Sequence, residues 1–412
     1  MSLISSKPKP CCGVDRSDDV PLAASRMKLV WRRPQRSQVV IFDRYATQGV
    51  IPILEVGTFS VFENRRSRLH VLAMLHMIAR FRFSWRDYCI SYLRLAGARV
   101  VVTGIDSNAT FYSLKHALPD VRFVAVQNGI RGNGSPVKNG DLWTMLADSP
   151  HQPPTVDVVA TFGQAHSRQY ARHVRCRTVE VGSSRSNLIP VRTSRQQTTN
   201  KRVGFISNFS GQPHAGVFPD GTASPTAMYL GTREVSAQEY FAADARVASL
   251  VADVCGSHGW DLHILGRRTA EFRHEREFFA NACGRLPHEF FPKTAEESSY
   301  QHLDTCDLVV AVDSTLGYEM IARGTRTVFV AARALLLGGE ESRQFAFGFP
   351  GDFQPSGPFW TTSLDREPIA EMMRRVMALS DDEWRAASEF LREQLMTFEP
   401  GNHKLRAAIF GS

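Results

Sequence analysis

The sequence predicts an α/β protein made of two doubly wound domains that face each other across a cleft. Three observations predict it: short apolar runs alternate with amphipathic stretches, a polar segment divides this alternation in two, and polar residues follow nearly every apolar run. Strands buried on both faces of a parallel sheet read as continuous apolar runs, and the helices between them carry apolar residues at helical spacing. One large α/β domain is the alternative that this pattern leaves open.

The composition divides the chain into five segments. These are a basic leader at 1–37 that we expect to be disordered, a first domain at 38–190, a polar linker at 191–201, a second domain at 202–396 and a tail at 397–412. The linker is polar and nearly free of apolar periodicity, which is typical of a connection between domains.

The first domain contains five predicted strands and a long helical stretch. The run R-V-V-V-T-G-I-D at 99–106 is the clearest strand, since a central parallel strand is apolar throughout. Residues 66–96 carry apolar side chains at helical spacing. The strands are expected at 37–43, 99–106, 122–129, 156–163 and 177–183.

The second domain repeats the alternation. A helix is expected at about 236–257, and a final amphipathic stretch at 365–396 contains Ser380 as a candidate N-cap. The strands are expected at 202–211, 261–268, 307–313 and 325–331.

The net charge of +8 is unevenly distributed, because residues 1–38 hold eight Lys/Arg and three Asp. Such a leader could be a disordered tail or could touch acidic lipid at the inner membrane face. It lacks the apolar core of a secretory signal, and no uncharged apolar stretch of membrane-spanning length occurs. The remainder is too weakly basic to indicate a nucleic-acid partner, and the absence of C-x-x-C pairs favours reduced thiols in the cytoplasm.

Several nucleotide-handling and catalytic classes are excluded by missing motifs. The chain has no P-loop, no G-x-S-x-G elbow and no G-x-G-x-x-G after an early strand. No H-E-x-x-H or similar ligand spacing occurs among its thirteen histidines, so we expect neither a metal site nor a cofactor.

Polar residues cluster directly after the predicted strands, where the carboxyl ends of parallel strands form the ligand-binding edge of a sheet. The first-domain set, expected to face the cleft between the domains, is Asp43, Asp106, Asn108, Gln127, Asn128 and Arg131. The second-domain set, expected to face the same cleft, is Ser207, Asn208, Arg267, Arg268, Ser314, Thr315 and Glu319.

The stretch V-D-S-T-L-G-Y-E at 312–319 is the most informative of these. It leaves an apolar strand and enters a helix, whose free N–H groups and positive dipole end suit a phosphate. Glu319 lies about one turn into that helix and could reach a sugar hydroxyl.

Structural explanations also stand for these residues. The Ser, Thr and Asn side chains could be helix N-caps, Asp43 could simply end a strand, and Arg267 and Arg268 could be a solvated pair. The Asn128-Gly129 dipeptide could be an ordinary turn.

Read together, these segments resemble the bacterial surface carbohydrate biosynthesis family of transferases over about residues 38–396. The matching stretches are V-V-I-F-D (39–43), V-V-T-G-I-D-S-N-A-T-F-Y-S-L-K (101–115), V-Q-N-G-I-R (126–131), G-F-I-S-N-F (204–209), I-L-G-R-R (264–268), S-Y-Q-H-L-D (299–304), D-S-T-L-G-Y-E-M-I-A-R-G (313–324), F-G-F-P (347–350) and G-P-F-W-T-T (357–362). More distantly, the pattern is similar to the two-Rossmann-domain (GT-B) Kdo transferases of capsule and O-antigen assembly, which use CMP-activated sugar.

The resemblance implies that the second domain holds the donor nucleotide and that the first domain holds the acceptor. It also implies a role for several residues. Ser314 and Thr315 would contact the donor phosphate and Glu319 the ribose. Ser207 with Arg267 or Arg268 would lie beside the phosphate and the sugar carboxylate. Some distant relatives carry an acidic residue where this chain has Asn128, so the catalytic carboxylate is assigned here to Asp106.

The function expected from these observations is a cytoplasmic glycosyltransferase that moves a sugar from a nucleotide-activated donor to a surface polysaccharide or lipid-linked acceptor. One alternative is a CDP-alcohol-dependent polyol-phosphate transferase, which would need a histidine base such as His214 or His263. Another is a non-catalytic nucleotide-binding member of an assembly complex.

Overall fold

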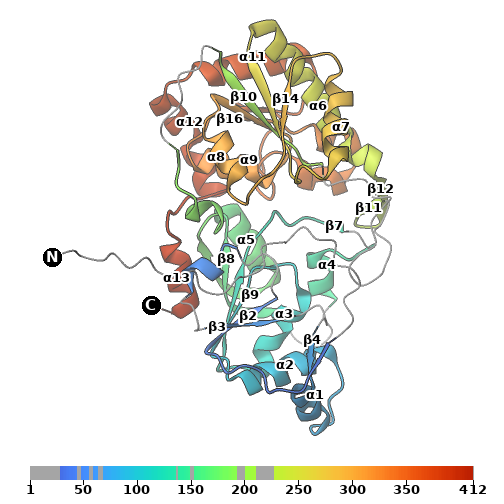
Figure 1. Ribbon diagram of the computed structural model, residues 1–412, viewed down its shortest axis with the longest axis vertical. Helices are drawn as coiled ribbons and strands as arrows, with labels where there is room; N and C mark the ends of the chain where they lie inside the picture. The colour runs from blue at the N-terminus through green and yellow to red at the C-terminus, as the bar shows by residue number, and fades with distance from the viewer. Residues whose placement is uncertain are drawn as a thin grey trace, which may run out of the picture.

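The computed structural model describes residues 28–43, 48–54, 59–63, 68–135, 138–148, 153–192, 200–209 and 227–411. Two α/β domains lie one above the other along the long axis of the molecule, each around its own six-stranded parallel sheet (Figure 1). The predicted fold class is therefore confirmed. Residues 1–27 of the expected leader, 193–199 of the expected linker and the loop with His214 lie outside the described residues.

The first sheet has the strand order β3-β2-β5-β6-β8-β9, and its neighbouring strands are all parallel. Its strands are β2 (Val39–Phe42), β3 (Phe59–Phe62), β5 (Val100–Thr103), β6 (Arg122–Val126), β8 (Thr155–Thr161) and β9 (Arg175–Glu180). The helices of this domain are α1 (Val71–Ile78), α2 (Trp85–Ala96), α3 (Ala109–Leu114), α4 (Leu142–Ala147) and α5 (Gln164–His173), with 3-10 turns η1 (Ile51–Ile53), η2 (Lys115–Ala117) and η3 (Ser186–Leu188). A short parallel pair, β1 (Lys28–Val30) with β4 (Arg68–His70), lies outside the main sheet.

The long helical stretch expected at 66–96 is divided into β4, α1 and α2. The break has a local cause, because Ser84 restarts the helix as a capping box. Its hydroxyl accepts a hydrogen bond from the Asp87 amide at 3.1 Å, and the Asp87 carboxylate accepts from the Ser84 amide.

The second sheet has the order β14-β13-β10-β15-β16-β17 and is also parallel throughout. Its strands are β10 (Arg202–Ile206), β13 (Asp261–Leu265), β14 (Glu289–Phe291), β15 (Leu308–Ala311), β16 (Thr327–Val330) and β17 (Trp360–Thr361). The helices are α6 (Ala237–His258), α7 (Arg273–Cys283), α8 (Ser298–Leu303), α9 (Thr315–Ala322), α10 (Ala332–Leu337), α11 (Arg366–Ala378) and α12 (Asp381–Gln394), with the 3-10 turn η4 (Glu340–Phe345). Ser380 caps α12 as predicted, and it splits the expected stretch 365–396 into two helices.

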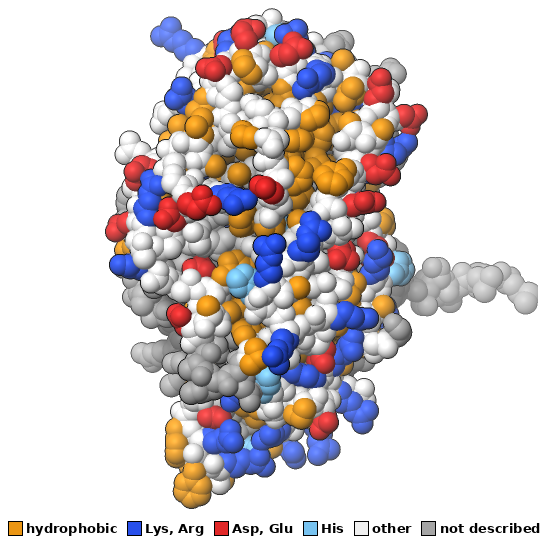
Figure 2. Space-filling model, turned by 180° about the vertical axis from the view of Figure 1, so that it is seen from behind, with side chains coloured by type: hydrophobic (Ala, Val, Ile, Leu, Met, Phe, Trp, Pro, Cys, Tyr) orange, Lys and Arg blue, Asp and Glu red, His pale blue; other side chains and the backbone are white. Residues whose placement is uncertain are grey.

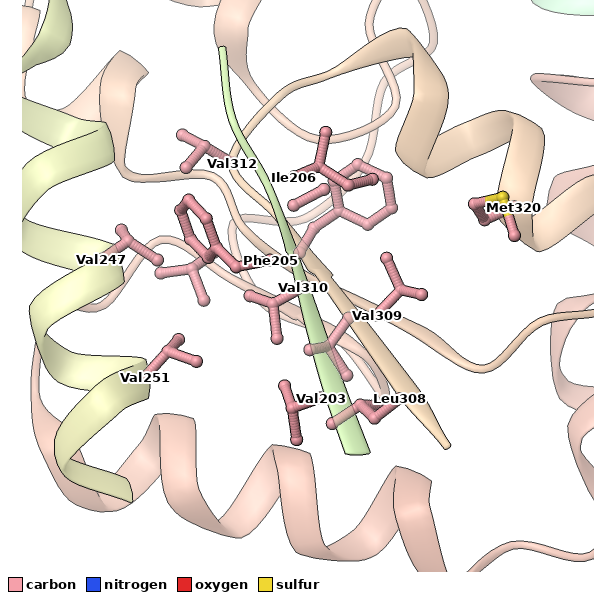
Figure 3. Close-up of a cluster of buried hydrophobic side chains, with 14 of the residues drawn as sticks. Val203, Phe205, Ile206, Val247, Val251, Leu308, Val309, Val310, Val312 and Met320 are labelled. Carbon is pink, nitrogen blue, oxygen red and sulfur yellow. The ribbon is translucent and has the colours of Figure 1, made fainter. Parts of the chain in front are cut away.

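The core of the second domain explains why its strands lack alternation. Figure 3 shows Phe205 of β10 facing Val247 and Val251 of α6, while Met320 of α9 lies on the other side of the strands. Both faces of the sheet are thus covered by helices, so apolar residues are favoured at every strand position.

Residues 397–412 are not a simple tail. After α12 the chain returns to the first domain and forms α13 (His403–Phe410), whose Leu405, Ala408 and Ile409 are buried with side chains of the first sheet. Buried apolar residues at this spacing identify α13 as a packed part of the first domain.

The two domains also meet through a small antiparallel sheet. Strand β7 (Gly134–Ser135) of the first domain pairs with β11 (Ala227–Leu230) of the second, and β11 pairs with β12 (Arg233–Ser236). Beside it, the Gly134 amide donates to the Gln344 side-chain oxygen at 3.1 Å. None of the helices in the described parts of the chain has the length and apolar character needed to cross a bilayer.

The packing of α13 yields a stability prediction. We expect Leu405→Ala to lower the free energy of unfolding by about 2–5 kcal/mol, because it leaves a cavity in a buried cluster. Urea denaturation measures this change. The matched control is Phe410→Ala in the same helix, where an exposed ring is removed and a change within about 0.5 kcal/mol is expected. Equal effects of the two substitutions would contradict the packed position of α13.

Candidate functional site

The N-terminus of α9 lies where β15 ends, as the sequence predicted. Ser314 occupies the N-cap position, but its side chain makes no capping hydrogen bond. Both Ser314 and Thr315 are partly exposed. Gly317 lets α9 approach the sheet, because a Cβ there would lie 2.7 Å from both Ala311 and Phe329. The helix start is therefore held close to the carboxyl edge of the second sheet with hydroxyl groups available to a ligand.

A buried ion-pair network fixes this helix start. Asp313 precedes the N-cap and accepts from the Arg333 Nε at 2.6 Å, and Arg333 Nη2 donates to Asp244 at 2.6 Å. Asn208, which follows β10, donates to the other Asp313 oxygen at 2.5 Å. Burial opposes the charge of Arg333, yet Asp244 and Asp313 hold its pKa well above the ordinary value. The network thus joins the ends of β10 and β15 to α6 and α10. It also engages the side-chain NH2 group of Asn208.

A second buried carboxylate organises the turns after β10 and β13. Glu275 of α7 accepts from the Ser207 hydroxyl at 2.5 Å and from the Arg267 and Arg268 amides at 2.8 and 3.0 Å. The Ser207 oxygen in turn accepts from the Phe209 amide at 3.1 Å. Burial raises the pKa of Glu275, and these hydrogen bonds oppose the rise. Ser207 is buried as well, so this geometry supports a positioning role for it rather than the predicted ligand contact.

Three arginines bring positive charge to this edge. The Arg267 side chain has no hydrogen-bond or ion-pair partner among the described residues. Desolvation by the surrounding protein and the charge of Arg268 lower its pKa, and the nearby Glu275 carboxylate opposes this lowering. Arg185, which follows β9 of the first domain, also contributes to that lowering and pairs with Glu296 at 3.3 Å. Like charges held close together without full compensation favour binding of an anion.

Glu319 lies one turn into α9 and is buried at the boundary between the domains. It accepts from the Tyr300 hydroxyl at 2.5 Å. Burial raises the pKa of Glu319, while hydrogen bonds from Tyr300 and Ser183 and the charge of Arg185 oppose the rise. Since Ser183 and Arg185 belong to the first domain, Glu319 faces both domains.

Arg323, four residues further along α9, connects the domains directly. Its guanidinium donates to both Asp304 oxygens at 3.1 and 2.6 Å. It also donates to the backbone carbonyls of Ser186, Ile189 and Pro190 at 2.9–3.2 Å. The segment that leaves the first domain is therefore anchored on the helix that carries the candidate site.

Asp106 follows β5 as predicted, but it is fully buried and both of its oxygens are bonded. Arg131 and Tyr170 both donate to its carboxylate, and the Asn128 amide donates to Oδ1 at 3.2 Å. The Arg131 guanidinium also contacts the Asn128 side chain. This geometry supports Asp106 as a positioning residue for Arg131 and Asn128, and the catalytic role assigned to it from sequence stays a prediction.

The other predicted first-domain residues occupy different environments. Gln127 is buried and accepts from the Phe162 amide at 2.9 Å. Asn108 takes the N-cap position of α3 without a capping hydrogen bond. Asp43 ends β2 with a backbone φ of 85°, which L-residues adopt rarely and which is often found at functional sites.

His263 does not lie at a strand end. It occupies the middle of β13 and its Nδ1 lies 2.8 Å from His302 Nε2, so the two rings share a hydrogen bond. Burial lowers the pKa of both histidines to about 4. Together with Cys306 they form a group with metal-ligating side chains, which the sequence spacing did not predict.

The predicted residues of the second domain therefore lie together around the turns after β10, β13 and β15. Of the predicted residues of the first domain, Asp106, Asn128 and Arg131 contact one another, and the others lie in separate environments. Sequence reasoning missed the buried partners that hold the site, namely Asp244, Glu275, Arg333, Tyr170 and Tyr300. Arg323 lay within the quoted motif, and its i+4 spacing from Glu319 was the available signal.

Two Rossmann-like domains that face each other define the GT-B architecture. The chain belongs to the family described as "putative O-antigen biosynthesis protein", whose model matches residues 124–409. No curated protein matches the chain in sequence.

Solved structures resemble the fold at low sequence identity. HepE from Anabaena, solved in complex with UDP, has 12% identity and a TM-score of 0.50 and covers 86% of this chain and 95% of its own. A Listeria monocytogenes protein described as a "putative UDP-N-acetylglucosamine 2-epimerase" has 9% identity and a TM-score of 0.48, and the match covers 90% of this chain and 96% of its own. TarM from S. aureus has 10% identity and a TM-score of 0.44, covering 79% of this chain and 58% of its own, so this chain spans less than two thirds of that protein.

The environment of Glu319 predicts a pH-dependent stability difference. Because burial raises its folded-state pKa, ionised Glu319 destabilises the fold at neutral pH, and this penalty disappears as the pH falls below the unfolded-state pKa. Glu319→Gln mimics the protonated side chain. We expect it to unfold at higher urea concentration than the wild type at pH 8, with the difference vanishing near pH 4.

The control for this prediction is Glu383→Gln, which should change the stability at pH 8 in the opposite direction. Hydrogen bonds from the Ser380 backbone and side chain lower the pKa of Glu383, so its charge is favourable and its loss should destabilise at pH 8. An increase in stability with Glu383→Gln, or a decrease at pH 8 with Glu319→Gln, would contradict the two assigned environments.

Proposed function

We propose that this protein is a glycosyltransferase of GT-B architecture that transfers a sugar from a nucleotide-activated donor to a surface polysaccharide or lipid-linked acceptor. The observation that carries the proposal is the convergence of three features at the domain boundary. These are the open N-terminus of α9, the buried Glu319, and the Arg267 guanidinium with its neighbours Arg268 and Arg185. Membership of an O-antigen biosynthesis family supports the same reading.

The proposed chemistry assigns each feature a task. The bond between the donor sugar and the phosphate breaks while the acceptor oxygen forms a bond to the same carbon, and the acceptor proton passes to a base. Negative charge then grows on the departing nucleotide, where arginines and a helix N-terminus stabilise it without a metal ion. Glu319 would hold a ribose hydroxyl, since a carboxylate accepts hydrogen bonds from both neighbouring hydroxyls.

The identity of the nucleotide is part of the proposal. The resemblance to Kdo transferases favours a CMP-activated acidic sugar, whose carboxylate would provide a second anion for the three arginines. The similarly folded HepE was solved with UDP, so a uridine nucleotide is the competing donor. A comparison of CMP, CDP, UMP and UDP at equal concentration distinguishes these donors.

The base that accepts the proton is assigned to the first domain. Asp106 is the carboxylate predicted from sequence, although its saturated hydrogen bonding favours a role in orienting Arg131. Asp43 is the second candidate, because its unusual backbone conformation lies at the carboxyl end of β2. Gly49, six residues after Asp43, packs closely against Ser184, because a Cβ at position 49 would collide with the Ser184 side chain.

The polyol-phosphate alternative is not favoured by the described residues, because His263 lies in mid-strand and is bonded to His302. The non-catalytic alternative is separated from an enzyme by measuring turnover and binding on the same variants.

The first test concerns nucleotide binding. Arg267→Ala should weaken binding of the preferred nucleotide about 10- to 100-fold, because one charge-assisted contact to phosphate is lost. Isothermal titration with the full-length protein measures the dissociation constant. The matched control is Arg273→Ala, an exposed arginine on α7, which should bind normally. The absence of binding of any of the four nucleotides to the wild type at millimolar concentration would overturn the proposal.

The second test concerns catalysis. Asp43→Asn and Asp106→Asn should each retain nucleotide binding, and the substitution that removes the base should lower kcat by at least about a hundredfold. If Asp106 only positions Arg131, Asp106→Asn should instead raise KM for the acceptor and lower thermal stability. Sugar transfer from radiolabelled donor is the measurement. Normal turnover in both variants would exclude both carboxylates as the base.

A further inference from the structure

Helix α1 lies at the end of the first domain that is remote from the second domain (Figure 1), and it carries an exposed apolar stripe. Leu72, Leu75 and Ile78 recur every three residues on the outer face of α1, and all three are exposed. The stripe continues beyond the helix in Phe81 and Phe83, which are 88% and 71% exposed. A contiguous exposed stripe of this kind is unusual on a monomeric domain and marks an interaction surface.

A neighbouring strand adds an aromatic residue to this end. Strand β1 pairs with β4, which runs directly into α1, and the His70 ring lies 3.2 Å from the Arg32 carbonyl. Trp31, beside that carbonyl, is 75% exposed. Indole and phenyl rings at the rim of an apolar surface are favoured at the boundary between water and lipid.

The same end is strongly basic. Residues 28–36 and 68–99 contain ten Lys/Arg and one Asp, a net charge of +9 against +8 for the whole chain. Asp87 is already engaged in capping α2 and pairs with Arg82 at 3.3 Å. Figure 2 shows Lys and Arg side chains gathered at this end, with hydrophobic side chains at its extremity.

The positive charges lie close together and are compensated in part, since Glu63 pairs with Arg68 at 3.4 Å and Asp87 pairs with Arg82. Burial and the charges of Arg80 and Arg82 lower the pKa of Arg94, and the ring of His76 is affected in the same way by Arg80 and Arg94. Charges that repel one another in the free protein are stabilised when a negatively charged surface approaches.

We propose that this basic-aromatic tip, made of the exposed side chains Trp31, Leu72, Leu75, Ile78, Phe81 and Phe83 with Arg80, Arg82 and Arg94, docks on an anionic lipid bilayer. The apolar stripe enters the interface between headgroups and acyl chains, and the arginines contact lipid phosphates. A second copy of the chain is a poor occupant, because two surfaces of high positive charge repel each other. A nucleic acid would match the charge, but it could not cover the aliphatic stripe.

The proposal stands independently of the nucleotide site, which lies at the other end of the first domain. It would orient the protein so that α1 faces the bilayer and the second domain points away from it (Figure 1). The contact is made by folded residues of the first domain, whatever the leader contributes.

The test uses full-length protein and vesicles of phosphatidylcholine with or without about 30% phosphatidylglycerol. We expect sedimentation with the anionic vesicles only, weakened by added salt. Phe81→Ser with Phe83→Ser should weaken the partition about tenfold or more. Arg80→Gln with Arg94→Gln should weaken it about fivefold per arginine.

Matched controls separate the tip from general surface effects. Phe390→Ser removes a ring that is 62% exposed on α12 of the second domain, and Arg374→Gln with Arg385→Gln lowers the net charge equally. Both controls should sediment like the wild type. Fluorescence of Trp31 provides a second readout, since a blue shift on vesicle binding should be lost in Trp31→Phe.

Three outcomes would overturn the proposal. Vesicle binding that all variants retain would assign the contact to another part of the chain. A monomeric protein that does not sediment with anionic vesicles would show that the tip does not bind a bilayer. The protein could instead dimerise with rising concentration, or bind an RNA oligomer and no vesicle. If the Phe81 and Phe83 substitutions abolished that association, the tip would belong to another partner.

Discussion

Two buried guanidinium groups hold the helix on which the candidate site depends. Arg333 binds Asp313 just before α9 begins, and Arg323 leaves the other end of α9 to bind Asp304 and the chain leaving the first domain. A buried charge is stable only when it is paired and its donors are satisfied, so neither arginine tolerates displacement of its partners. The start of α9, the position of Glu319 and the spacing of the domains are consequently fixed by the same requirement.

The edges of the two sheets differ in how their charge is used. At the edge of the first sheet, the polar groups after β5 and β6 form hydrogen bonds to one another, as in the contacts among Asp106, Asn128 and Arg131. On the second sheet the carboxylates Glu275 and Asp313 hold backbone and side-chain groups in place, while the Arg267 guanidinium has no hydrogen-bond or ion-pair partner among the described residues. The second sheet therefore offers positive charge to a ligand. Arg185 of the first domain adds a further positive charge from across the domain boundary.

The sequence predicted the sheets well because continuous runs such as Val100–Thr103 and Leu308–Ala311 carry a local signal. It also placed polar residues directly after the strands, as at Asp106 and Asp313, since parallel strands end on one edge of a sheet. It could not predict that Asp106 would be saturated by Tyr170, or that Glu275 would take the Ser207 hydroxyl. Such contacts join residues far apart in the chain and depend on tertiary packing. The return of α13 was missed for the same reason, because its amphipathic pattern does not say which domain it covers.

The path of the chain has a mechanical consequence. The backbone passes between the domains once after Pro190 and again before α13, and the two passages are joined by the hydrogen bond between Asn187 and Asn402 at 2.9 Å. The Asn187–Asn402 bond therefore ties the two chain connections to each other. Any separation of the domains would also have to part β7 from β11 and break the bonds of Arg323 to the first domain. Relative movement of the domains is thus opposed at three separate places along their boundary.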